Sequence, residues 1–334
     1  MTPIINCIVN KDTKKNPIWL MRQAGRYLPE FREIRKKNQD FIKLCLNSKL
    51  SSEITLQPIK RFSFDAAIIF SDILMVPYGL GQPITFEKNF GPRLGNFEIE
   101  TLKEINEEDF TNSLNSIYNS ISITSKNPLI KNRDMIGFVG APWTILVYMI
   151  NKISPKKNKL SDKFFEDNSL NNILLNIIEK FLKIHIKNQV KAGANVIQIF
   201  DSWAGLLENN ISEFIYVPTL KIVQYVKTLG VPVICFPRGI KDYKKYCELI
   251  KPDMISIDYE LNPEKIIKEV NIPIQGGLDP KVLLTDKGIL KKEVRKYLEI
   301  FKDHPYVFNL GHGILPETKI DMVNELIEIV RNFK

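Results

Sequence analysis

Short, continuously apolar runs recur along this chain, and each is followed by a longer stretch of mixed polarity. Runs that are apolar at every position, rather than at alternate ones, are typical of parallel strands covered on both faces. Eight strands are predicted in this way, at residues 18–21, 66–70, 135–139, 196–200, 231–236, 254–257, 272–275 and 306–310.

The segments between these runs follow helical spacing. The clearest is residues 170–190, where an apolar stripe begins at Leu170, Ile173 and Leu174 and Gly193 supplies a stop. Alternating strands and helices predict an α/β fold. Eight such units predict a single (β/α)8 TIM-type barrel over residues 1–334, with the active site in a cleft at the C-terminal ends of the strands. A doubly wound open sheet remains the alternative.

A cluster of arginines directly follows the first apolar run. Arg22 ends that run, Arg26 comes four residues later, and Arg35 lies after a proline-broken turn. Guanidinium groups near a strand end are costly to bury without an anion, and arginine pairs with carboxylate or phosphate at two points. This segment therefore predicts a site for a ligand with several negative charges. For Arg35, an internal ion pair with Glu30 or Glu33, or a place on a solvated helix, remains open.

Other strand ends also carry polar side chains. Asp72 lies between two apolar runs, so it should be partly buried and should meet donors of the protein or of a ligand. His312 stands between two glycines, where its pKa suits proton transfer or carboxylate binding near neutrality. Ser202 follows the strand at 196–200, and Tyr148 offers a hydroxyl on an apolar helix, although such a tyrosine is more often a core residue.

Composition narrows the class of protein. The 334 residues carry a formal net charge of +9, which favours anionic partners without identifying them. The lysine-rich tract at 156–159 is more simply a solvated surface than a nucleic-acid patch, and residues 151–168 are predicted to form an exposed loop. No apolar run reaches the roughly 20 residues that a membrane span needs. We therefore expect a cytoplasmic protein without nucleic-acid or membrane partners.

Several familiar kinds of site are missing from the sequence. The four cysteines are widely spaced, which predicts free thiols in a reducing compartment. The glycine patterns of dinucleotide and P-loop sites are absent. With only three histidines and no close His/Cys cluster, neither a metal site nor a metal cofactor is predicted.

Four segments together closely resemble the uroporphyrinogen decarboxylase family of haem biosynthesis. They are MRQAGRYLPE at 21–30, FSDIL at 70–74, GFVGAPWT at 137–144 and FNLGHG at 308–313, and the resemblance extends from about residue 17 to 318. It implies a cofactor-free (β/α)8 barrel, usually a homodimer. The implied reaction removes four acetate carboxyls from uroporphyrinogen III, which gives coproporphyrinogen III and four CO2.

The resemblance also implies roles for particular residues. Asp72 would bind the pyrrole N–H groups at the centre of the macrocycle. Arg22 and Arg26 would hold carboxylates, and Arg22 would be a proposed proton donor, although arginine gives up a proton reluctantly. The other implied substrate-binding residues are Gln23, Ala24, Gly25, Arg35, Tyr148, Ser202 and His312.

Three positions depart from the family pattern without touching the central motifs. Asn89 stands where glycine is common, Gly277 where asparagine is common, and Lys319 where an acidic residue or proline is usual. Two other functions stay open. A corrinoid-dependent methyltransferase of the same barrel superfamily would need a His-x-Cys metal pair, which this sequence lacks. A non-catalytic protein that binds tetrapyrroles or nucleic acid is the other.

Overall fold

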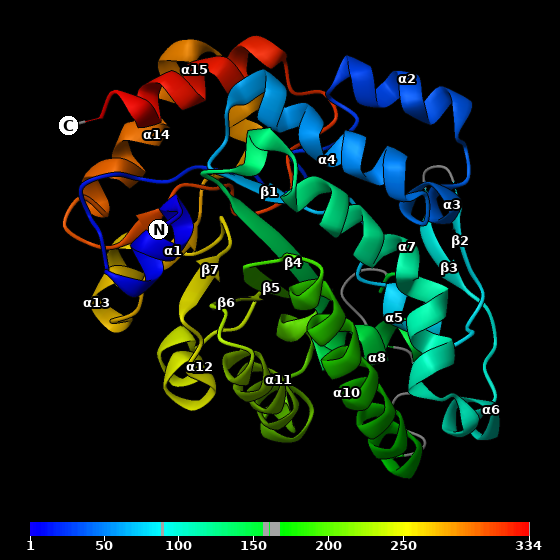
Figure 1. The fold of residues 1–334 in the computed structure, drawn as a ribbon. Coiled ribbons are helices and arrows are strands. Elements are labelled where there is room, and N and C mark those ends of the chain that lie inside the picture. The colour runs from blue at the N-terminus through cyan, green and yellow to red at the C-terminus, as the bar shows by residue number, and fades with distance from the viewer. Residues whose placement is uncertain (88–89, 156–159, 161–167, 334) are drawn as a thin grey trace.

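A computed structural model describes residues 1–87, 90–155, 160 and 168–333 (Figure 1). Asn89 and the lysine-rich tract at 156–159 lie outside the described residues, as does most of the loop predicted at 151–168.

One sheet of seven parallel strands forms the centre of the molecule (Figure 1). Its strands are β1 (Ala66–Ile68), β4 (Asp134–Gly140), β5 (Val196–Asp201), β6 (Val233–Pro237), β7 (Met254–Ile257), β8 (Ile274–Gly276) and β9 (Tyr306–Val307). Neighbours in the sheet are neighbours in the sequence, from β1 to β9 without reversal. A doubly wound sheet reverses its strand order at the centre. The predicted α/β barrel class is therefore confirmed, and the open-sheet alternative is wrong.

The two edge strands of this sheet are joined through residues 17–19. Phe308 donates its N–H to the carbonyl of Pro17 at 2.8 Å, and Trp19 donates to the carbonyl of Phe308 at 3.4 Å. On the other side, Asp65 donates its N–H to the carbonyl of Ile18 at 2.9 Å. Ile18 thus lies between β9 and β1 and curls the sheet toward closure.

Ile18 is a single bridge residue rather than a strand, so the prediction of eight strands is not confirmed. The reason lies in the next two backbone N–H groups. That of Leu20 donates to the side chain of Gln23 at 3.1 Å, and that of Met21 donates to the side chain of Asn309 at 2.8 Å. The chain therefore pairs with the neighbouring strands at Ile18 and does not continue as a strand.

Helices lie around the curled sheet (Figure 1). They are α2 (Pro29–Lys37), α3 (Phe41–Cys45), α4 (Ser48–Phe62), α5 (Met75–Gly79), α6 (Ile99–Glu104), α7 (Glu107–Ser125), α8 (Pro142–Asn151), α10 (Asn168–Lys191), α11 (Val217–Thr228), α12 (Tyr243–Ile250), α13 (Pro263–Glu269), α14 (Lys287–Ile300) and α15 (Ile320–Arg331). The helix predicted over 170–190 is confirmed as α10. An antiparallel hairpin, β2 (Ile84–Glu87) with β3 (Gly91–Leu94), stands apart from the sheet. Within the described ranges, no helix has the length and apolarity to cross a bilayer.

Helix α1 (Pro3–Val9) covers the amino end of the sheet. Its Ile4 and Cys7 pack with apolar side chains of β1, β4, β5 and β6 in a core cluster inside the sheet's curve. Because α1 covers this end, the opposite, carboxyl end is left for a site.

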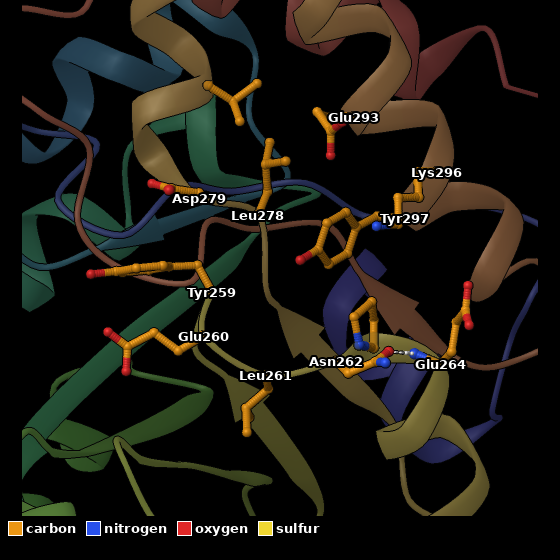
Figure 2. Close-up of a pocket in the computed structure, with 12 residues that line it drawn as sticks. Tyr259, Glu260, Leu261, Asn262, Glu264, Leu278, Asp279, Glu293, Lys296 and Tyr297 are labelled. Atoms are coloured by element: carbon orange, nitrogen blue, oxygen red, sulfur yellow. Dashed lines mark hydrogen bonds between the residues drawn. The ribbon is translucent and has the colours of Figure 1, made fainter.

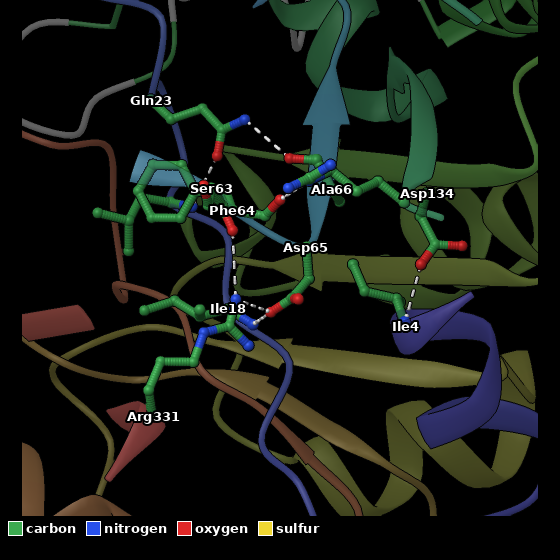
Figure 3. Close-up of polar contacts among 11 residues, drawn as sticks. Ile4, Ile18, Gln23, Ser63, Phe64, Asp65, Ala66, Asp134 and Arg331 are labelled. Carbon is green, nitrogen blue, oxygen red and sulfur yellow. Dashed lines mark hydrogen bonds and ion pairs between the residues drawn. The ribbon is translucent and has the colours of Figure 1, made fainter. Parts of the chain in front are cut away.

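Two carboxylates, those of Asp65 and Asp134, bind neighbouring segments at the amino end of the sheet (Figure 3). One oxygen of Asp65 accepts from the N–H of Ile18 at 2.7 Å and from the guanidinium of Arg331 at 2.8 Å. Asp134, the first residue of β4, accepts from the N–H of Ile4 at 2.8 Å. These contacts join the bridge segment, α15 and α1 to neighbouring strands.

Candidate active site

Arg22 stands in strained backbone at the turn after Ile18. Its φ of +62° is in the left-handed region, which costs a non-glycine residue roughly 1–2 kcal/mol. Two hydrogen bonds hold the turn in place. The N–H of Leu20 donates to the side chain of Gln23, and the N–H of Met21 donates to the side chain of Asn309. Strain that the surroundings hold in place is typical of functional positions.

The next residues of the motif build this turn. The Gln23 side chain is fully buried and donates to the carbonyl of Ala66 at 2.9 Å, so its amide serves the protein itself. Gly25 is partly exposed, and a Cβ there would lie 2.9 Å from the carbonyl of Arg22, so the close approach requires glycine. Ala24 is also partly exposed. The structure thus gives Gln23 and Gly25 the role of shaping the loop that carries the arginines.

The side chain of Arg22 lies across Gly313, where any Cβ would meet its Cγ, Cδ and Nε. The two segments are also joined by a hydrogen bond from the N–H of Ile314 to the carbonyl of Met21 at 2.9 Å. Arg22 and the neighbouring His312 are therefore brought together at the carboxyl end of the sheet. Arg22 is exposed, and His312 is half-buried.

Asp72 follows β1 and is half-buried. One oxygen accepts from the N–H of Leu74 at 2.9 Å, and no other donor of the described residues bonds to the carboxylate. Burial raises the pKa of Asp72 to about 6, while the Leu74 N–H and the charge of Arg22 act in the opposite direction. The side chain is thus an acceptor with spare capacity near a cation.

Tyr148 lies near Asp72 and Arg22. It projects from α8 and is buried, and burial raises the pKa of its hydroxyl. The charges of Asp72 and Arg22 act on that pKa in opposite directions, so both residues lie near the hydroxyl. The structure therefore brings Arg22, Asp72 and Tyr148 into one region.

Ser202 is half-buried in the turn after β5, and this turn is tied to α8. Thr144 of α8 donates its hydroxyl to the carboxylate of Asp201 at 2.6 Å and accepts from the N–H of Trp203 at 3.1 Å. The second oxygen of Asp201 is buried and has no partner among the described residues. Burial raises the pKa of Asp201 to about 7. Asp201 thus connects the turn of Ser202 with the helix of Tyr148.

Arg26 and Arg35 differ in their contacts. Arg26 is exposed, and its guanidinium bonds to none of the described residues. Arg35 donates to the carbonyls of Asn38 at 2.6 Å and Gln39 at 3.0 Å, and its guanidinium lies 5.7 Å from the ring of Phe41. Arg35 thus steadies the loop after α2, and the structure gives it no hydrogen bond or ion pair with the other candidate residues.

The internal ion pairs considered for Arg35 are wrong. Glu30 pairs with Arg61 at 2.9 Å, and Glu33 pairs with Lys36 at 2.6 Å. Both carboxylates therefore already have other partners.

His312 is neutral at physiological pH. Its pKa is lowered to about 4, chiefly by burial and further by the charges of Arg22 and Arg238. Arg238, which follows β6, is a residue that the sequence analysis missed. A cation directly after a buried strand was the available signal, as it was for Arg22.

A cavity of about 520 Å³ lies between α14 and the loops that follow β7 and β8 (Figure 2). Tyr259, Leu278, Asp279, Glu293 and Tyr297 are among its lining residues, and none of the predicted site residues is. Within the described part of the chain, no cluster of three His, Cys, Asp or Glu side chains could hold a metal ion.

Fold and geometry define a TIM-barrel-like protein whose arginines, histidine and half-buried aspartate gather at the carboxyl end of a curled parallel sheet. The family model described as Uroporphyrinogen decarboxylase (URO-D) matches residues 1–333. The chain belongs to the uroporphyrinogen decarboxylase family.

Relatives support this assignment over the whole length. The chain is 41% identical over 337 residues to a uroporphyrinogen decarboxylase of Rickettsia bellii, with 99% of each chain covered. It is 42% identical over 344 residues to one of Rickettsia massiliae, covering 100% of this chain and 98% of the relative. A methyltransferase from Methanosarcina mazei has a TM-score of 0.79 at 16% identity, with 98% of this chain and 96% of that chain covered, and so shares the fold.

Proposed function

We propose that this protein removes the four acetate carboxyls of uroporphyrinogen III. Each acetate arm and one proton become a methyl group and CO2, so four turns give coproporphyrinogen III. The observation that carries the proposal is the carboxylate of Asp72, which has spare hydrogen-bonding capacity beside Arg22. A porphyrinogen offers pyrrole N–H donors at its centre and carboxylates at its rim, which match these two groups.

The reaction needs an anion near the pyrrole. A proton adds to a ring carbon, and the C–C bond to the carboxyl then breaks. Its electron pair neutralises the ring cation and leaves an exocyclic methylene, which takes up a proton as the ring loses one. The attraction of Asp72 for the ring grows as positive charge develops, so it stabilises the transition state more than the ground state.

The other site residues bind and orient the substrate in this proposal. Arg22 and Arg26 hold rim carboxylates, since their guanidinium groups have no acceptor among the described residues. Neutral His312 donates an N–H to a carboxylate, and the hydroxyls of Tyr148 and Ser202 add further bonds. We assign Arg22 first to carboxylate binding rather than to proton donation.

We further propose that residues 1–334 act as one domain, in a cytoplasmic homodimer, without a cofactor. The substrate supplies its own electron sink, since the protonated pyrrole accepts the electrons that CO2 leaves behind. The free thiols of Cys7, Cys45, Cys235 and Cys247 are consistent with a reducing compartment. The methyltransferase alternative lacks its His-x-Cys pair in this sequence.

The deciding experiment is anaerobic incubation of the purified protein with uroporphyrinogen III. We expect four CO2 per macrocycle and stepwise products with seven, six, five and four carboxyls, counted by mass spectrometry after oxidation to porphyrins. Exhaustive dialysis against a chelator should leave the rate unchanged. Release of no CO2 would reject the proposal, and salt-sensitive retention of RNA in its place would favour a binding protein.

A further inference from the structure

We propose that Arg238 is a further substrate-binding residue, which joins Arg22 and His312 in binding one rim carboxylate on the β6–β9 side of the site. This inference rests on the proposed function, and it adds a carboxylate-binding position to that same site.

The backbone fixes Arg238 at the carboxyl end of the sheet. β6 ends at Pro237, which pairs with Asp201 at the end of β5. The N–H of Arg238 donates to the carbonyl of Asp201 at 3.1 Å, and its carbonyl accepts from the N–H of Gly205 at 2.9 Å. Arg238 is therefore held beside the turn that carries Ser202.

Close packing places Arg238 near His312. The N–H of Gly239 donates to the carboxylate of Asp258 at 3.0 Å. A Cβ on Gly311 would lie 2.8 Å from the carbonyl carbon of Asp258, so the segment before His312 packs directly on Asp258. Asp258 thus links the loop of Arg238 to the loop of His312. The lowering of the His312 pKa by both Arg22 and Arg238 agrees with this arrangement.

Arg238 differs from most other arginines in that its guanidinium group has no acceptor among the described residues. Six arginines donate to carboxylates or carbonyls of the protein: Arg32, Arg35, Arg61, Arg93, Arg133 and Arg331. Among the described residues, the guanidinium groups of Arg22, Arg26, Arg238 and Arg295 bond to no acceptor. Arg295 is exposed on α14.

Arg238 is the half-buried member of this unbonded set. A guanidinium that is partly removed from water needs an acceptor, and no described residue supplies one. An anionic ligand would supply it. Two guanidinium groups near a neutral imidazole suit a single carboxylate, which accepts several hydrogen bonds at once.

The test compares Arg238→Gln with Lys241→Gln. Lys241 is exposed on the same loop, so its substitution removes the same charge without touching the proposed contact. Fluorescence titration with uroporphyrin and coproporphyrin gives the affinities. We expect Arg238→Gln to weaken uroporphyrin binding by about 10- to 100-fold, as the loss of charge-assisted bonds predicts, and Lys241→Gln to have little effect.

The two porphyrins identify the bound arm. Weakening with uroporphyrin alone assigns the carboxylate to an acetate, because coproporphyrin lacks these arms. Weakening with both assigns it to a propionate. Unchanged affinity for both, or equal weakening by Lys241→Gln, overturns the role of Arg238.

A second variant guards against loss of folding. Arg238→Lys keeps the charge but not the planar fork, so it should weaken binding several-fold at an unchanged melting temperature. Wild-type affinity in this variant, together with wild-type affinity in a folded Arg238→Gln, rejects the inference. A wild-type protein that binds neither porphyrin and releases no CO2 rejects the proposed function itself, so the two failures are distinguishable.

Discussion

Asp134 at the amino end of the sheet and Asp72 at the carboxyl end share one property and differ in another. Burial raises the pKa of each to about 6. Asp134, however, accepts hydrogen bonds from the N–H of Ile4 at 2.8 Å, the hydroxyl of Thr2 and the amide of Asn195 at 3.3 Å. From the described residues, Asp72 accepts only one, from the N–H of Leu74. A raised pKa therefore marks burial, whereas unused acceptor capacity distinguishes the candidate site.

The arginines at the two ends repeat the contrast. Arg331 at the amino end is paired with Asp65 at 2.8 Å. Arg22 at the carboxyl end has no acceptor among the described residues, and its backbone is strained. Barrel proteins commonly place stability at one end and chemistry at the other. Here the aspartate and arginine side chains compared above bond within the protein at the amino end of the sheet, whereas at the carboxyl end they keep the capacity to bind a ligand.

The largest expected effect is that of Asp72→Asn. Loss of the central anion should lower kcat by about 10²- to 10³-fold. The folded state raises the pKa of this carboxyl, so its ionisation costs stability above about pH 6. The asparagine variant should therefore be more stable than the wild type at pH 8, by about 1–3 kcal/mol, and the gain should be largely lost at about pH 4, near the ordinary pKa of the group. Steady-state turnover and urea unfolding at both pH values measure the two effects.

Asp134→Asn is the matched control at the other end. Its amide nitrogen would face donors that now bond to a carboxylate, and this mismatch of about 1–3 kcal/mol should offset the stability gained above about pH 6 when the ionised group is removed. Turnover per folded molecule should stay at the wild-type value. Near-normal turnover in Asp72→Asn, or a large loss in Asp134→Asn, would break the comparison.

Arg22→Gly should relieve the backbone strain at residue 22 while removing the side chain that is proposed to bind substrate. Glycine adopts a φ of +62° readily, so the unfolding free energy should stay level or rise by about 1 kcal/mol. Turnover should fall about 100-fold, because a carboxylate clamp is lost. Lys251, the residue that caps the C-terminus of α12 at a φ of +52°, offers the control. Lys251→Gly should gain similar stability without any change in turnover. Wild-type turnover in Arg22→Gly would contradict the proposed clamp.

Much of the fold was predictable because continuous apolar runs report burial on both faces. The strand ends were less so. The strand predicted at 306–310 is only Tyr306–Val307, because the side chain of Asn309 takes up the N–H groups of Leu310 and Met21 at 2.8 Å. Such a side-chain-to-backbone bond leaves no mark on hydrophobic periodicity.

The candidate site was predictable as far as its residues follow strands or belong to motifs. Asp72 and Arg22 stand beside apolar runs that made them visible. Arg238 follows a strand in the same way, but only the structure shows that it lacks an acceptor. Gln23 belongs to the motif at 21–30 and Arg35 follows it, yet the structure gives both side chains contacts within the protein. Whether a polar side chain is already bonded is a property of tertiary packing.

The pH dependence of activity offers a smaller but specific test. Asp72 must be ionised to act as the central anion, so kcat/KM should fall as the pH drops below about 6. Asp134 has the same raised pKa but no proposed role, so Asp134→Asn should leave this limb in place. A limb near pH 7 that disappears in Asp201→Asn would assign the titration to Asp201 instead.

The smallest expected effect is that of Arg26→Lys. The variant keeps the charge but loses two-point pairing with a carboxylate, so KM for uroporphyrinogen should rise several-fold with little change in kcat. Arg61→Lys is the matched substitution in a contact that is already satisfied, since Arg61 pairs with Glu30 at 2.9 Å through two nitrogens. There the change should cost at most about 1 kcal/mol of stability and leave KM alone, because exposed ion pairs contribute little. If both variants raised KM equally, the free guanidinium of Arg26 would be no more suited to substrate than a paired one, and the distinction between bonded and unbonded arginines would lose its meaning.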